Sequence, residues 1–90
     1  MALLGEKDKA INFVELSLEQ FQTLIFNIET IIRVINTIIK INDKEGGFKE
    51  QNKSLNSLKI KLLQIKQKDK LNDKDIKELQ ELINQIKANN

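Results

Sequence analysis

Apolar residues recur at alternating steps of three and four along the first half of the chain. Because an α-helix completes a turn about every 3.6 residues, this spacing brings the side chains onto one face. The pattern predicts one long amphipathic helix from about residue 6 to about residue 42. The row consists of Ile11, Val14, Leu18, Phe21, Ile25, Ile28, Ile32, Ile35 and Ile39.

The later part of this predicted helix is apolar over a wider face. Leu24, Ile31 and Ile38 form a second row beside the first one. A face of this width exceeds what one partner helix covers. We therefore expect at least two other helices to pack against it.

A polar segment that ends in Gly46 and Gly47 separates this helix from the second half of the chain. Glycine adopts the left-handed conformation that ends many helices, so residues 43–47 predict a turn. The three-four rhythm then resumes and predicts a second helix over about residues 48–68.

Asn72 and Asp75 have the spacing of a helix N-cap and its partner in the first turn. This pair predicts a third helix over about residues 73–88, with a break near residues 68–73. The apolar rhythm also continues if Asp69 and Asn72 are counted as polar positions of the row. One helix over residues 48–88 is therefore the alternative.

The two arms on either side of the turn have nearly equal lengths, which favours an antiparallel hairpin. Residues 1–43 carry a formal charge of −2 and residues 44–90 carry +4, so the arms attract each other weakly. The expected fold is a single all-α domain over residues 1–90. It is a long helical hairpin whose second arm is broken, giving three helices.

A lone hairpin would leave part of the wide apolar face in water. The third helix could fold back to form a three-helix bundle, from which the front of the long helix would protrude toward a partner. Two hairpins could instead form a four-helix bundle that is similar in shape to the Rop type, without a residue-level match. We expect a homodimer, because two-fold assemblies are the commonest.

Histidine and cysteine are both absent from the sequence. The usual bases and nucleophiles of catalysis are therefore missing, as are the common ligands of zinc. Carboxylate pairs such as Glu15 with Glu19 are ordinary on a solvated helix face. We expect no enzymatic activity, no cofactor and no metal.

The most apolar window contains Glu29, Arg33 and Lys40, which are costly inside a membrane. No signal peptide is apparent, and the absence of cysteine fits a reducing compartment. We therefore expect a cytoplasmic protein. The net charge of +2 does not by itself indicate a polyanionic partner.

Several large apolar residues lie at the front of the long helix or away from the apolar rows. Solvated helix faces rarely carry two large aliphatic residues such as Ile60 and Leu63. We expect a small oligomeric module that binds another protein as an adaptor, scaffold or inhibitor. The candidate contact residues are Phe13, Leu16, Phe21, Phe26, Ile60 and Leu63.

The second predicted helix is rich in lysine, which suggests nucleic-acid binding as the alternative. Phosphate contacts need only such charges, whereas base recognition needs arginine, asparagine or aromatic residues beside them. A solvated flank of a helical bundle explains the same lysines more simply. The candidate phosphate-binding residues are Lys59, Lys61, Lys66, Lys68 and Lys70.

Overall fold

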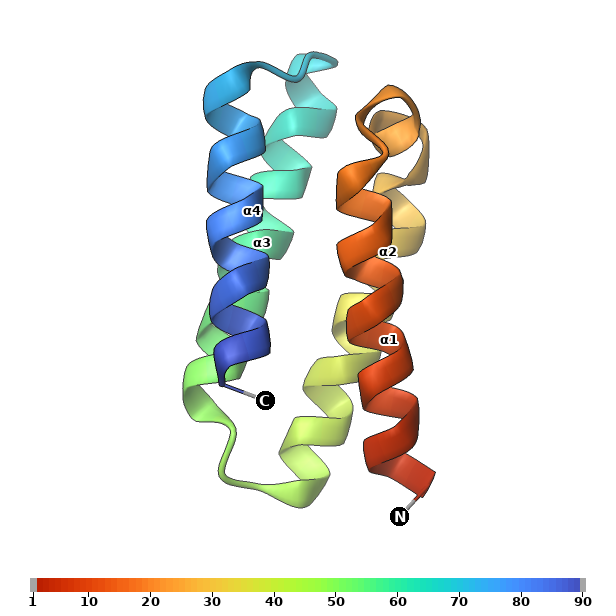
Figure 1. Ribbon diagram of the computed structural model, residues 1–90, viewed down its shortest axis with the longest axis vertical. Helices are drawn as coiled ribbons and strands as arrows, with labels where there is room; N and C mark the ends of the chain where they lie inside the picture. The colour runs from red at the N-terminus through yellow and green to blue at the C-terminus, as the bar shows by residue number, and fades with distance from the viewer. Residues whose placement is uncertain (1, 90) are drawn as a thin grey trace.

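Residues 2–89 fold as four antiparallel helices that run alternately up and down (Figure 1). The computed structural model describes residues 2–89, without the side chains of residues 2–4, 21–23, 25 and 26. The described residues contain no strand, which confirms the all-α class. The helices are α1 (Ala2–Glu19), α2 (Phe21–Glu45), α3 (Lys49–Lys68) and α4 (Asp73–Ala88).

Each helix packs against two neighbours, and the ring is closed by a contact between α1 and α4. The pair α1 and α4 makes the smallest of the four contacts. In the part of the chain that the structure describes, the backbones of α1 and α3 are not neighbours, so these helices occupy diagonal corners. The bundle measures 38 × 20 × 18 Å.

The long helix predicted over residues 6–42 is wrong, because the chain turns back at Gln20. This residue has φ −96° and ψ 68°, outside the helical region. The backbone N–H of Gln20 donates to the carbonyl of Ser17 at 3.3 Å. The turn folds α1 back along α2, so that Ile11, Val14 and Leu18 join the core.

This break corrects the expected hairpin of three helices to a bundle of four. The wide apolar face of α2 is covered by α1 and α3 of the same chain. This face was the reason to expect a dimer. Because helices of the same chain already cover it, it does not require a second copy. Self-association remains a prediction that needs other support.

The centre of the α2 face also differs from the predicted row. Leu24, Ile31 and Ile38 are fully buried, whereas Ile32 and Ile39 lie partly exposed at the edge of the core. Aliphatic side chains from all four helices fill the interior. The buried core consists of Ile11, Val14, Leu18, Leu24, Ile28, Ile31, Ile35, Ile38, Leu55, Leu58, Leu62, Ile65, Leu79, Ile83 and Ile86.

The other two connections use the residues that the sequence indicated. Gly46 and Gly47 have φ angles of 74° and 82°, which a residue with a side chain rarely adopts. Helix α3 ends at Lys68 and is followed by Asp69, which has the left-handed φ of 55°. Asn72 and Asp75 form a reciprocal capping box, in which each side chain accepts the backbone N–H of the other. The break therefore falls inside the interval expected from the sequence.

None of the described helices combines the length and the apolar content that a membrane crossing requires.

Candidate interaction surfaces

Ile60 and Leu63 lie on the outer side of α3, where they are 56% and 46% exposed. The inner side of α3 is complete without them, since Leu55, Leu58 and Leu62 are fully buried. Residues three apart on a helix are neighbours, so Ile60 and Leu63 form one apolar patch. We call this pair the α3 patch.

A second pair of exposed apolar residues lies on α1. Phe13 is 42% exposed and Leu16 is 51% exposed, and we call this pair the α1 patch. The two patches belong to helices on diagonal corners of the bundle. The other two candidates, Phe21 and Phe26, have side chains outside the described residues.

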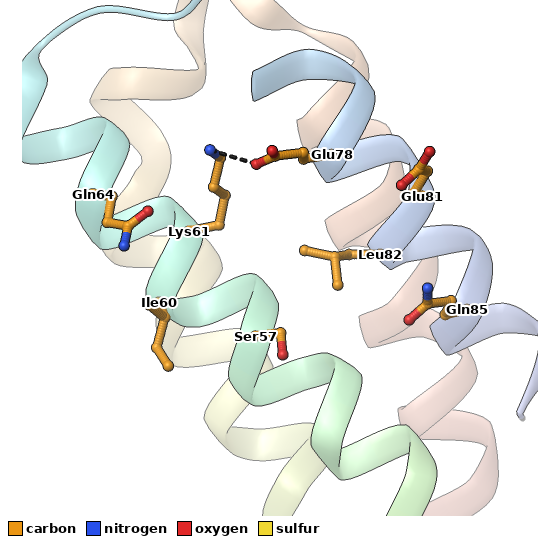
Figure 2. A pocket seen from close by; sticks show the side chains of 8 residues that line it. All are labelled: Ser57, Ile60, Lys61, Gln64, Glu78, Glu81, Leu82 and Gln85. Atoms are coloured by element: carbon orange, nitrogen blue, oxygen red, sulfur yellow. Dashed lines mark ion pairs between the residues drawn. The ribbon is translucent and has the colours of Figure 1, made fainter. Parts of the chain in front are cut away.

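A groove of about 360 Å³ runs between α3 and α4 beside the α3 patch. Figure 2 shows Ile60 at its outer edge and Leu82 reaching from α4 toward α3. The remaining lining residues are polar: Ser57, Lys61, Gln64, Glu78, Glu81 and Gln85. The groove therefore offers apolar contacts within a polar rim, which is the usual composition of a protein-binding surface.

Lys61 closes one end of this groove by bridging two carboxylates of α4. Its Nζ lies 2.7 Å from Asp75 and 2.5 Å from Glu78, as Figure 2 shows for Glu78. The hydrogen bonds to these carboxylates raise the pKa of Lys61. The hydrogen bond from Lys61, more than any other cause, lowers the pKa of Asp75. Lys61 and Asp75 therefore both stay charged at neutral pH and form an ion pair.

The candidate lysines do not form one continuous basic patch. Lys59 donates to Asn36 of α2 at 3.2 Å, and Lys66 is paired with Glu29 of α2. On the other flank, Lys61 and Lys68 both approach Asp75, with Lys68 at 3.6 Å. Lys70 takes part in none of these contacts. Most of these charges are thus directed toward neighbouring helices.

The helices nevertheless differ strongly in charge. Helix α1 contains four carboxylates and two lysines. Helix α3 contains six lysines and one glutamate. The acidic and basic helices therefore lie on opposite corners of the bundle.

A polar cluster ties three helices together near the α2–α3 turn. The Asn42 amide donates to Gln51 at 2.9 Å and to Asn52 at 2.8 Å. The Gln51 amide in turn donates to the carbonyl of Ile86 at 2.8 Å. Gln51 lies four residues before Leu55 in the row of α3, so its burial follows the rhythm of that row.

Lys7 is the residue that sequence reasoning missed most clearly. Its side chain is fully buried, and its Nζ has no hydrogen-bond partner among the described residues. The ammonium lies over the ring of Phe48, 3.3 Å from the centroid. Burial lowers the pKa of Lys7. The available signal was its place four residues before Ile11, on the apolar row of α1.

Within the described residues, no three carboxylates gather closely enough to hold a metal ion. No protein-family model, curated protein or solved structure matches this chain.

Proposed function

We propose that this chain is a non-enzymatic module that binds another protein through the α3 patch and the adjacent groove. One observation carries the proposal: Ile60 and Leu63 are exposed although the core of α3 is complete without them. Fully burying such a side chain contributes roughly 1.5–3 kcal/mol, and covering the exposed part of both gives about half of that from each, which is enough to help anchor a partner.

The groove indicates which partner would fit. Helical recognition commonly places apolar residues at positions i, i+3, i+4 and i+7 into a groove between helices. The apolar contacts would come from Ile60 and Leu82 in the groove and from Leu63 beside it, with the polar rim fixing the orientation. We propose an amphipathic helix of another protein as the bound segment, and an adaptor, scaffold or inhibitor as the biological role. The cytoplasm remains the proposed location, on composition alone.

Nucleic-acid binding is the second candidate, because α3 carries six lysines and one glutamate. The ion pairs of Lys61, Lys66 and Lys68 weaken this candidate, since phosphate binding would have to compete with them. Binding to nucleic acid should fall steeply as salt rises, whereas binding through apolar side chains should change little.

The two pairs of exposed residues supply a matched test. A partner captured from the native host would be purified and titrated against the wild type, Ile60→Ser/Leu63→Ser and Phe13→Ser/Leu16→Ser. We expect the α3 variant to bind at least about tenfold more weakly, equivalent to about 1.4 kcal/mol, and the α1 variant to bind normally. Equal binding by all three proteins would exclude the α3 patch as the binding site.

A further inference from the structure

The connection between α1 and α2 is a single residue, Gln20, and it is not of a type that favours turns. Gln20 makes no side-chain capping hydrogen bond, and residues 19–22 contain neither glycine nor proline. By contrast, the α2–α3 connection contains two glycines at positive φ, and a capping box precedes α4. The residues around Gln20 are compatible with a continuous helix.

The apolar rhythm also passes through this connection without interruption. Leu18, Phe21 and Ile25 follow one another at steps of three and four. A straight helix through Gln20 would therefore keep the apolar positions before and after it on one face. It would also pair backbone N–H and C=O groups that the two helix ends at the break leave without helical partners.

We propose that two copies of this chain exchange α1, so that α1 and α2 of each copy form one continuous helix. The α1 helix of each copy then occupies the place beside α2 and α4 of the other copy. Ile11, Val14 and Leu18 make the same core contacts as in the closed bundle. The proposal is independent of the α3 patch and of the proposed function.

Two specific contacts explain why the helix that occupies this site beside α2 and α4 should be the α1 of a second copy. In the closed bundle, Glu15 of α1 pairs with Lys87 of α4 at 2.6 Å. Lys7 of α1 lies over Phe48, next to the start of α3. Both contacts are recreated between chains after the exchange, whereas an unrelated helix would have to reproduce their spacing by chance. The two forms thus differ mainly at the connection and in the entropy of association.

The exchanged form has a distinctive shape. A continuous helix over residues 2–45 would be roughly 65 Å long at about 1.5 Å per residue. The closed bundle is only 38 Å in its longest dimension. Two exchanged bundles would lie end to end at the former connection, and small-angle scattering would show a particle about twice as long as the monomer.

Substitution of Gln20 tests the exchange on the full-length chain. At each connection, Gln20→Ala should favour the continuous helix about fivefold more than Gln20→Gly does. A dimer contains two such connections, so the dimerisation constants of the two variants should differ about twenty-five-fold. Each variant would be unfolded, refolded at high concentration and sized by light scattering. Equal dimerisation of the two variants, or none by Gln20→Ala, overturns the proposal.

Cross-linking distinguishes an exchanged dimer from two closed bundles that touch at their surfaces. The chain has no cysteine, so Glu15→Cys/Lys87→Cys introduces one site on α1 and one on α4. A short bis-maleimide should join two chains in an exchanged dimer, which then migrates as a dimer on a denaturing gel. Isolated dimer that yields only internally linked monomer overturns the proposal. Ile60→Ser/Leu63→Ser should leave the exchange unchanged.

Discussion

Lys61 on α3 lies 2.7 Å from Asp75, the residue that also completes the cap of α4. Asp75 is only 3% exposed, so its carboxylate has few water molecules to replace these partners. The Asp75 side chain therefore helps to cap the start of α4 and also joins α4 to α3.

Replacing Asp75 with alanine should destabilise the protein by about 2 kcal/mol, because it removes a cap and the principal partner of Lys61. Urea denaturation followed by circular dichroism would measure this change. Glu78→Ala is the matched control, since Glu78 also pairs with Lys61 but is more exposed. We expect it to cost less than about 0.5 kcal/mol. Similar losses for both variants would contradict the central role of Asp75.

The contribution of Asp75 should depend on pH in a defined direction. Its pKa in the folded protein is lowered from the ordinary value of 3.8, chiefly by the hydrogen bond from Lys61. The stabilisation is therefore complete above 3.8 and is lost as pH falls through the lower folded-state pKa. The stability difference between the wild type and Asp75→Asn should shrink in urea titrations between about pH 6 and pH 2. A difference that stays constant would argue against this ion pair.

Replacing Lys7 with methionine should leave stability unchanged or raise it by about 1 kcal/mol. The contact with Phe48 contributes at most about 2 kcal/mol, whereas burying an ammonium without a hydrogen-bond partner costs several kcal/mol. Methionine keeps the length of the side chain and contacts aromatic rings favourably. Thermal unfolding would measure the change, and a loss above about 1 kcal/mol would show that the cation stabilises the fold.

The same variant should alter the behaviour at alkaline pH. Burial lowers the pKa of Lys7 in the folded protein, so the unfolded chain holds this proton more tightly. The wild type should therefore gain stability relative to Lys7→Met as pH rises from the folded-state pKa toward 10.5. If the free energies of unfolding of the two proteins changed with pH in parallel, Lys7 would have to be exposed to water.

A pair of identical substitutions tests the assignment of buried and exposed faces. Ile35 is fully buried, and Ile35→Ala should cost about 3 kcal/mol through lost burial and the cavity that remains. Ile60→Ala should change stability by less than about 0.5 kcal/mol, because Ile60 is largely in water. Comparable losses in denaturant titrations would mean that Ile60 is part of a core.

The parts of the fold that depend on local chemistry were predictable from the sequence. The spacing of Asn72 and Asp75 indicated the start of α4, and both capping hydrogen bonds are present. Gly46 and Gly47 indicated the central turn for a similarly local reason, because few other residues adopt positive φ.

The break at Gln20 was not predictable in this way. Its neighbours suit a helix, and the apolar row continues across it. The turn becomes favourable only when α1 packs on the wide face of α2, which is a property of the complete bundle. The same packing moves the centre of the α2 face to Leu24, Ile31 and Ile38.

The surface features also divide into those that the sequence predicts and those that it does not. The positions of Ile60 and Leu63 away from the apolar row indicated that the α3 core did not need them, and both are exposed. Their partner stays a prediction. The groove beside Leu82 and the contact of Lys7 with Phe48 depend on how separate helices are placed. No spacing within a single helix could reveal them.

The unequal charges of α1 and α3 give the molecule a permanent electric dipole across its short dimension. The net charge of +2 understates this asymmetry, since one corner is acidic and the opposite corner is basic. A charged surface would thus select which side of the bundle it meets, and anion and cation exchangers would hold the same protein in opposite orientations.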